Sequence, residues 1–214
     1  MNKKDILPKK IPIFPLSNFI IFPETTVPLN IFEPRYIKMI SDSLNGSKMI
    51  GMIQPKKSYN KGVPELYSIG CIGKIESFQE TKDGRYMIIL NGLSRFKVLD
   101  EIKNNKIYRE CEVSFNDFKN DVGNLKKEME FSNLKLILKD IKILFKKKGF
   151  EINWNEIEKQ SVNQTINTLS MASPFSIEEK QALLETEDLD LRKKKLEEIL
   201  VTYVMDNFSN TTLQ

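Results

Sequence analysis

The sequence lacks histidine altogether and contains few cysteines. Without histidine the chain cannot form a Ser-His-Asp triad, a Cys-His pair or an imidazole metal site. Cys71 and Cys111 lie far apart and form no C-x-x-C pair, so we expect no metal or redox site from them. Both lie in apolar segments, where a free cysteine usually behaves as a small buried hydrophobe. Ser-Lys dyads and paired carboxylates remain as the catalytic arrangements to consider.

Arginine is also scarce, although the net charge is +4. The arginines are Arg35, Arg85, Arg95, Arg109 and Arg192. Bidentate phosphate recognition favours arginine, whereas scattered lysines mostly keep a surface solvated. Lys135, Lys139 and Lys142 fit two interpretations, a solvated helix face or a surface for acidic partners.

Long apolar runs are missing from the start of the chain. The longest run there covers residues 19–22, and it is flanked by prolines at positions 8, 12, 15 and 23. A secretory signal needs about 7–15 apolar residues and a membrane span about 20. We therefore expect a cytoplasmic protein with no membrane segment.

Residues 10–115 show the pattern of a small β barrel or sandwich. The expected strands cover residues 11–14, 26–31, 49–53, 67–79, 85–99 and 107–115, with a helix over 33–44. Asp83-Gly84 predicts a hairpin turn, and Gly92 predicts a bulge or bend in the strand that follows it. Prolines in the first two strands favour edge or bulge positions.

The polar segment 116–124 predicts a boundary, and we divide the chain into a β-rich part, residues 1–118, and a helical part, residues 119–214. Apolar residues at every third or fourth position predict helices over 131–148, 154–169 and 176–184, and a fourth from about 188. Gly149 fits a helix end, and Ser176 with Glu179 forms a capping box. Helices with such short links predict a bundle.

No motif assembles a nucleophile, a base and an oxyanion site. The stretch from Gly70 to Lys74 lacks the spacing of a phosphate-binding loop, and its glycines are better explained by close packing. Glu178 and Glu179 are expected in the first turn of a helix, where carboxylates are favoured electrostatically. We therefore expect no enzyme activity, no cofactor and no metal.

A strand-to-helix connection offers a candidate recognition surface. Within PLNIFEPRYIKMI, the side chains of Phe32, Pro34, Arg35 and Tyr36 could contact a peptide. The same apolar residues could equally lock the helix onto the barrel.

Three collinear stretches carry a resemblance to a known family. The first is FPLSNFIIFPETTVPLNIFEPRYIKMI, from Phe14 to Ile40. The second, Tyr67 to Ile102, contains a glycine pair, the Asp-Gly turn and a Gly-x-x-Arg-Phe phrase, and the third runs from Ser173 to Leu200. Together they resemble the amino-terminal substrate-recognition domain of Lon proteases, and especially bacterial proteins that consist of that domain only.

This resemblance implies an α+β fold, with a PUA-like β pseudo-barrel followed by an α-helical bundle. It also implies a role, because this domain of Lon engages unfolded or degron-bearing protein segments before they reach the ATPase ring. The sequence ends at Gln214 without a Walker motif, an AAA+ module or a Ser-Lys peptidase domain. ATP-dependent proteolysis is therefore not part of the expectation.

We hypothesise a non-catalytic module that binds protein or peptide segments and works as an adaptor or chaperone-like factor, with a separate protease or chaperone as a further partner. The peptide would enter an apolar groove between barrel and helix, or pair with an open sheet edge. The alternative is RNA binding, because PUA-like barrels in other families bind RNA. Scarce arginine and the lack of a basic-aromatic strand motif make nucleic acid the weaker hypothesis. The sequence predicts no particular oligomeric state.

Overall fold

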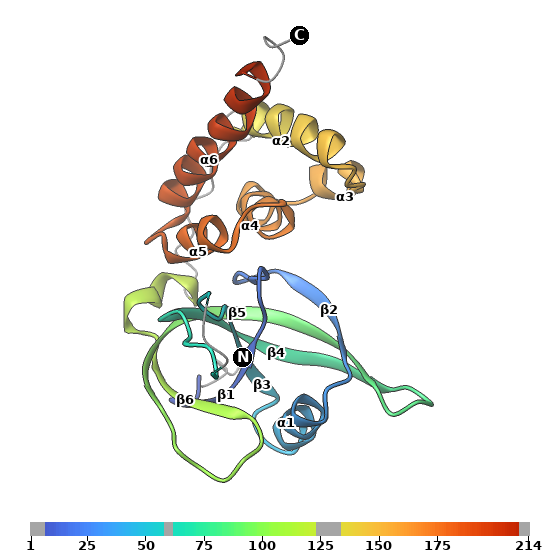
Figure 1. Cartoon of the computed structure of the whole chain (residues 1–214), viewed down its shortest axis with the longest axis vertical. Helices are drawn as coiled ribbons and strands as arrows, with labels where there is room; N and C mark the ends of the chain where they lie inside the picture. Colours follow the sequence, from blue (N-terminus) through green and yellow to red (C-terminus); the bar gives the residue numbers. More distant parts are fainter. Residues whose placement is uncertain (1–6, 58–61, 123–133, 210–214) are drawn as a thin grey trace, which may run out of the picture. The chain divides into compact units, whose positions relative to one another are not determined.

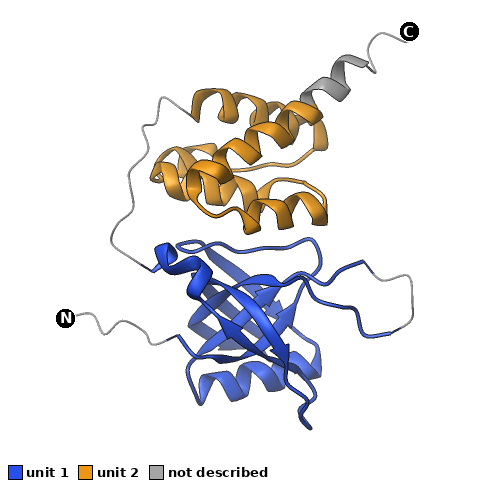
Figure 2. Ribbon diagram, turned by 90° about the vertical axis from the view of Figure 1, so that its left-hand side faces the viewer, with its two compact units in different colours: residues 1–122 blue, residues 123–214 orange. Residues whose placement is uncertain are grey.

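In the computed structural model, residues 1–122 and 123–214 form two units (Figure 2). The structure describes residues 7–57, 62–122 and 134–209. The described strands all lie in the first unit, and the second is built from helices (Figure 1). The predicted α+β fold, a partly closed barrel followed by helices, is confirmed.

Six strands form the sheet of the first unit: β1 (Lys10–Pro15), β2 (Thr26–Ile31), β3 (Met49–Ile53), β4 (Ile69–Glu80), β5 (Tyr86–Glu101) and β6 (Arg109–Ser114). Their order is β2-β5-β4-β3-β1-β6, and β6 also pairs with β5. This last pairing closes five strands into a partial ring and leaves β2 outside it. The pairing of β1 with β3 is parallel, and the other ladders are antiparallel.

The long strand β5 changes partner along its length. Residues 86–91 pair with β2, and residues 97–101 pair with β6. Between them the register with β4 shifts, since Gly73 pairs with Gly92 but Ile72 pairs with Ser94. A Cβ atom on Gly92 would lie 2.0 Å from the Phe22 carbonyl oxygen, so only glycine fits this close approach. The predicted bulge at Gly92 is confirmed.

The interior of the ring is apolar. Its main cluster consists of Ile11, Ile13, Met49, Ile53, Ile72, Phe96, Cys111 and Val113. Helix α1 (Pro34–Leu44) packs beside it through Tyr36, whose ring meets that of Phe14 edge-on at 4.5 Å between centroids. Both cysteines are fully buried and unbridged, as the sequence predicts.

A buried ion pair attaches the end of the first unit to β5. The short helix η1 (Asn116–Asp121) places Asp121 against Arg95, whose Nη2 donates to Oδ1 at 2.9 Å and whose Nε donates to Oδ2 at 2.9 Å. The two side chains are only 3% and 10% exposed. Phe118 is buried beneath Arg95, and the Arg95 guanidinium carbon lies 4.3 Å from the centroid of the Phe118 ring. Residues 116–121, which belong to the segment expected to contain the boundary, are thus a packed part of the first unit.

The second unit contains α2 (Lys135–Lys148), α3 (Trp154–Glu158), α4 (Val162–Ala172), α5 (Ile177–Glu185) and α6 (Leu189–Ser209). Gly149 ends α2 in the left-handed conformation, and the Ser176–Glu179 capping box starts α5, as predicted. Arg192 of α6 is buried and donates to the Leu183 carbonyl and to the Asn167 side chain, so it ties α6 to α5 and α4. Gly123 and Asn124 of the predicted boundary segment, and Phe131 of the predicted first helix, lie outside the described residues.

Two details of the sequence prediction are wrong. The single helix expected over 154–169 is two helices, because Ser161 and Gln164 form a capping box that starts a new helix at Val162. The prolines of β1 do not place it at an edge, since β1 lies between β3 and β6. Pro12 falls just before the pairing with β3 begins and Pro15 is the last residue of the strand, so few ladder bonds are lost.

Replacing Asp121 by alanine should destabilise the first unit, because it removes the carboxylate that compensates a buried guanidinium. The expected loss is about 3 kcal/mol in the free energy of unfolding, measured by urea denaturation followed by circular dichroism. Arg85→Ala is the matched control, because Arg85 and Asp83 form an exposed pair whose loss should cost below about 1 kcal/mol. Equal effects of the two substitutions would contradict the structural role of the buried pair.

The Gly92→Ala variant should unfold at a lower temperature than the parent protein. Its methyl group would overlap the Phe22 carbonyl, and overpacking of this kind typically costs about 1–3 kcal/mol or more. Gly62→Ala is the control, because no atom lies within 4 Å of a Cβ placed there. A thermal melt of Gly92→Ala that matches that of Gly62→Ala would show that β5 does not need glycine at its bend.

Candidate functional site

The four residues proposed from the sequence as a peptide-binding surface fall into two groups. Phe32 is 64% exposed, and Pro34 and Arg35 are exposed beside it at the start of α1. Tyr36 is buried, with its ring against Phe14 and the Arg35 guanidinium 4.5 Å from its centroid. Burial also raises the pKa of the Tyr36 hydroxyl. Tyr36 therefore fixes the helix to the sheet and offers no surface to a partner, whereas Phe32 does.

An apolar hollow of about 350 Å³ lies close by, on β2, β5 and β4. Three consecutive residues from each strand line it: Pro28, Leu29 and Asn30; Met87, Ile88 and Ile89; Ser77, Phe78 and Gln79. We call this hollow the outer groove. Phe32 follows directly on β2, two residues after Asn30, which lines the outer groove, but Phe32 is not itself a lining residue.

The strand register explains the shape of the outer groove. Ile89 pairs with Pro28 and Ser77, and Met87 pairs with Asn30 and Gln79, so two rows of side chains cross the three strands. Side chains alternate between faces along a strand, and Ile88, between the rows, is 1% exposed. Met87, on the opposite face, is 50% exposed. The two rows, which include the exposed Met87, therefore lie on the face opposite Ile88, and the groove is lined by both rows together with Leu29, Ile88 and Phe78 between them.

The free edge of β2 is a poorer place for a peptide than the outer groove. Among the described strands β2 pairs only with β5, so its other edge is open. Pro28, in the middle of β2, has no N–H to donate. Proline is tolerated in a strand where its nitrogen faces away from the ladder, and at an edge it discourages the pairing of a further strand. Of the two modes considered from the sequence, a groove fits better than strand addition, and this groove is formed by strands.

The arginines do not form a phosphate-binding cluster, because each already has a partner within the chain. Arg95 and Arg192 are buried. Arg35 pairs with Glu33, Arg85 with Asp83, and Arg109 with Glu101. The structure therefore gives no support to the alternative of nucleic-acid binding through arginine.

Glycines and carboxylates that superficially suggest chemistry have structural roles. A Cβ on Gly70 would lie 2.5 Å from the Met52 carbonyl oxygen, so this glycine permits close strand packing. Glu179 accepts a hydrogen bond from the Ser176 N–H at 2.7 Å, as part of a helix cap. Burial raises the pKa of the Cys111 thiol to about 11, which keeps it protonated near neutral pH.

Residues 7–57, 62–122 and 134–209 contain neither a metal-binding cluster nor a helix suited to crossing a membrane. No cluster of three or more histidine, cysteine, aspartate or glutamate side chains is placed to hold a metal ion. None of the helices combines the length and apolar character needed to cross a membrane.

Sequence reasoning missed Met87 and Ile89, the apolar walls of the outer groove. In the sequence they stand among other apolar residues of a strand, where alternation cannot tell which face the barrel covers. The available signal is that Asn30 and Gln79, the polar ladder partners of Met87, are exposed. Those pairings link distant parts of the chain, so only the assembled sheet reveals them.

The whole chain resembles Lon proteins of bacteria. It is 27% identical over 202 residues to Lon protease 2 of Myxococcus xanthus, covering 94% of this chain and 24% of that protein. It is 25% identical over 202 residues to Lon protease of Anaeromyxobacter dehalogenans, again covering 94% of this chain and 24% of that protein. The chain thus spans about a quarter of the length of these curated relatives.

Solved structures show the same fold. The crystal structure of a Lon N-terminal domain protein from Xanthomonas campestris superposes with a TM-score of 0.60 at 22% identity, covering 91% of this chain and 98% of that one. The N-terminal domain of the Mycobacterium avium complex Lon protease gives a TM-score of 0.59 at 17% identity, covering 90% and 98%. The family model of the ATP-dependent protease La (LON) substrate-binding domain matches residues 10–202. The chain therefore belongs to the LON substrate-binding domain family.

Proposed function

We propose that this chain is a non-catalytic recognition module that binds exposed apolar segments of other proteins, in unfolded or degron-bearing regions, at the outer groove. The observation that carries the proposal is an apolar hollow on the open face of β2, β5 and β4, in a chain of the LON substrate-binding domain family. Large folded surfaces would not enter such a hollow, whereas apolar side chains of an unfolded segment would.

The chemistry of the groove suits a segment of varied sequence. Met87 and Ile89 supply apolar surface. The flexible methionine side chain can adapt to partners of different shape. Asn30, Ser77 and Gln79 stand beside them with amide and hydroxyl groups that can bond a peptide backbone. The volume of the outer groove, about 350 Å³, is at the lower end of the range for ligand sites. Each bound segment would therefore insert a few apolar side chains, with Phe32 extending the contact.

The proposal places recognition in this chain and further steps in a partner. The relatives are named Lon proteases, and this chain matches about a quarter of their length. We therefore propose that a bound segment passes to a protease or chaperone in the cytoplasm. Affinity purification followed by mass spectrometry should recover such a partner together with client proteins.

A single charge in the outer groove should weaken client binding. We expect Met87→Asp to weaken the affinity for a reduced, alkylated α-lactalbumin by about tenfold or more, because an apolar segment would then desolvate a carboxylate. Fluorescence anisotropy of the labelled client gives the dissociation constants. The parent protein should bind the native form of the same client far more weakly.

Leu99→Asp is the matched control, since Leu99 also lies on β5, is 59% exposed and is outside the outer groove. It should leave client binding unchanged. Equal loss in both variants, or equal binding of native and unfolded client, would refute the groove as the recognition site.

A further inference from the structure

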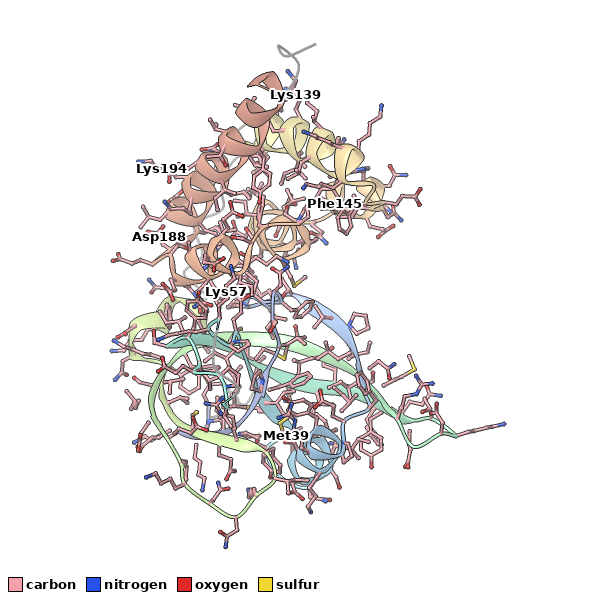
Figure 3. The ribbon with its side chains drawn as sticks, viewed as in Figure 1. Met39, Lys57, Lys139, Phe145, Asp188 and Lys194 are labelled. Carbon is pink, nitrogen blue, oxygen red and sulfur yellow. The ribbon has the colours of Figure 1, made fainter. Side chains whose placement is uncertain are left out.

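The exposed side of α2 carries a continuous row of lysines. Lys135, Lys139, Lys142 and Lys146 follow one another at spacings of four, three and four, which place them along one line of the helix. All four are exposed, and Lys139 is labelled in Figure 3. Asp140 is the one acidic residue within this lysine-rich helix. We call these four residues the lysine row.

Apolar side chains lie exposed beside the lysine row. Leu136 and Ile143 are seven residues apart on α2, and they are 62% and 44% exposed. They do not belong to the side that α2 buries, which consists of Ile137, Leu138, Ile141, Leu144 and Phe145. Phe150, just beyond the helix, is 52% exposed. Solvated lysines alone explain a polar helix face, but Leu136 and Ile143 add large apolar residues to it, and Phe150 adds another beyond its end.

The lysine row ends at an aromatic hollow of about 480 Å³. Lys142, Lys146, Phe145, Phe150 and Trp154 line it, together with Gly149, Ile152 and one acidic residue, Glu151, of the turn between α2 and α3. Gly149 turns the chain with a φ of 70°, and the Phe150 N–H donates to the Phe145 carbonyl at 3.0 Å. This turn brings Phe150 and Trp154 edge-on to Phe145, with centroid distances of 6.1 and 5.8 Å.

The positive charge sits at the rim of this hollow. Lys142 Nζ lies 5.2 Å from the centre of the Trp154 ring and 3.0 Å from Glu158 Oε1. Lys146 lies on the same side, one turn further along the helix. A ligand that fills the hollow with an apolar group would therefore place its flanking residues against ammonium groups. Carboxylates at those positions would be attracted, and lysines would be repelled.

We propose that the lysine row and the aromatic hollow bind an acidic segment of a partner protein. One aromatic or aliphatic side chain of that segment would enter the hollow, and carboxylates on either side of it would face the lysine row. Lysine without arginine favours carboxylates over the bidentate phosphate contacts of nucleic acid. A concave hollow suits an inserted side chain better than the broad surface of a membrane. This surface belongs to the second unit and is independent of the outer groove.

Trp154 is the single tryptophan of the chain and lines the hollow, so its fluorescence reports occupancy directly. The probe is a synthetic peptide in which glutamates surround one phenylalanine and two leucines, with no tryptophan. Binding should shift the Trp154 emission to the blue in a saturable way, because the half-buried ring loses water. Raising the salt concentration should weaken the affinity, since screening reduces attraction between exposed charges.

Removing charge from the lysine row tests which residues bind. The combined variant Lys139→Gln, Lys142→Gln and Lys146→Gln should weaken peptide affinity by about tenfold or more. Its control is Lys82→Gln, Lys103→Gln and Lys119→Gln, which alters three exposed lysines of the first unit by the same charge. Circular dichroism melts would show that both variants remain folded. Met87→Asp should bind the acidic peptide like the parent protein, which separates this test from that of the outer groove.

Three outcomes would overturn the proposal. The first is an unchanged Trp154 emission, or an equal response to a peptide with lysine in place of glutamate. The second is the same loss of affinity in the control variant. The third is a response to a single-stranded oligonucleotide, or to phosphatidylserine vesicles, without a response to the acidic peptide, which would assign the surface to nucleic acid or to membranes.

Discussion

The close approach of Phe22 to Gly92 is the constraint on which the first unit depends. The Phe22 carbonyl oxygen occupies the space that a side chain would need. At the same point the register between β4 and β5 shifts, so β5 bends. Beyond the bend β5 pairs with β6 and closes the ring, while before it β5 pairs with β2. One strand thus belongs to two differently shaped parts of the sheet.

The bend also divides β5 into a buried part that packs in the core and an exposed part that, in our proposal, binds peptides. On the closed side Phe96 is fully buried in the main core, and neighbouring Arg95 is held by Asp121. On the other side the outer face of the sheet is open, and it exposes Met87. Residues of the same strand therefore serve packing at one end and, in our proposal, peptide binding at the other. Pro28 fits this arrangement, because it discourages a further strand from pairing with the edge of β2, so a peptide would bind the face of the sheet instead.

The two proposed surfaces differ in chemistry. The outer groove combines apolar side chains with neutral amides and a hydroxyl, which suits segments of low charge. The lysine row and its aromatic hollow combine cations with aromatic rings, which suits acidic segments. Electrostatic attraction acts over about a Debye length and affects association rates, whereas apolar burial is short-ranged and mainly slows dissociation. A module with both surfaces would bind two chemically distinct classes of segment.

The sequence by itself determined the local elements of this fold. Strands over 26–31 and 49–53, the turn at Gly84, the end of α2 at Gly149 and the start of α5 at Ser176 were predicted where they occur. Each depends on residues close together in the chain, through backbone conformation or capping. The capping box at Ser161 is also local, because it depends only on Ser161 and Gln164, three residues apart.

Tertiary structure alone decided which side chains are available to a partner. Tyr36 and Phe32 are similar aromatic residues of one connection, yet Tyr36 is buried on Phe14 and Phe32 is exposed. Met87 became a candidate only when β5 was paired with β2 and β4. The reason is physical: exposure depends on which distant segment covers a face, and local preferences contain no information about that contact.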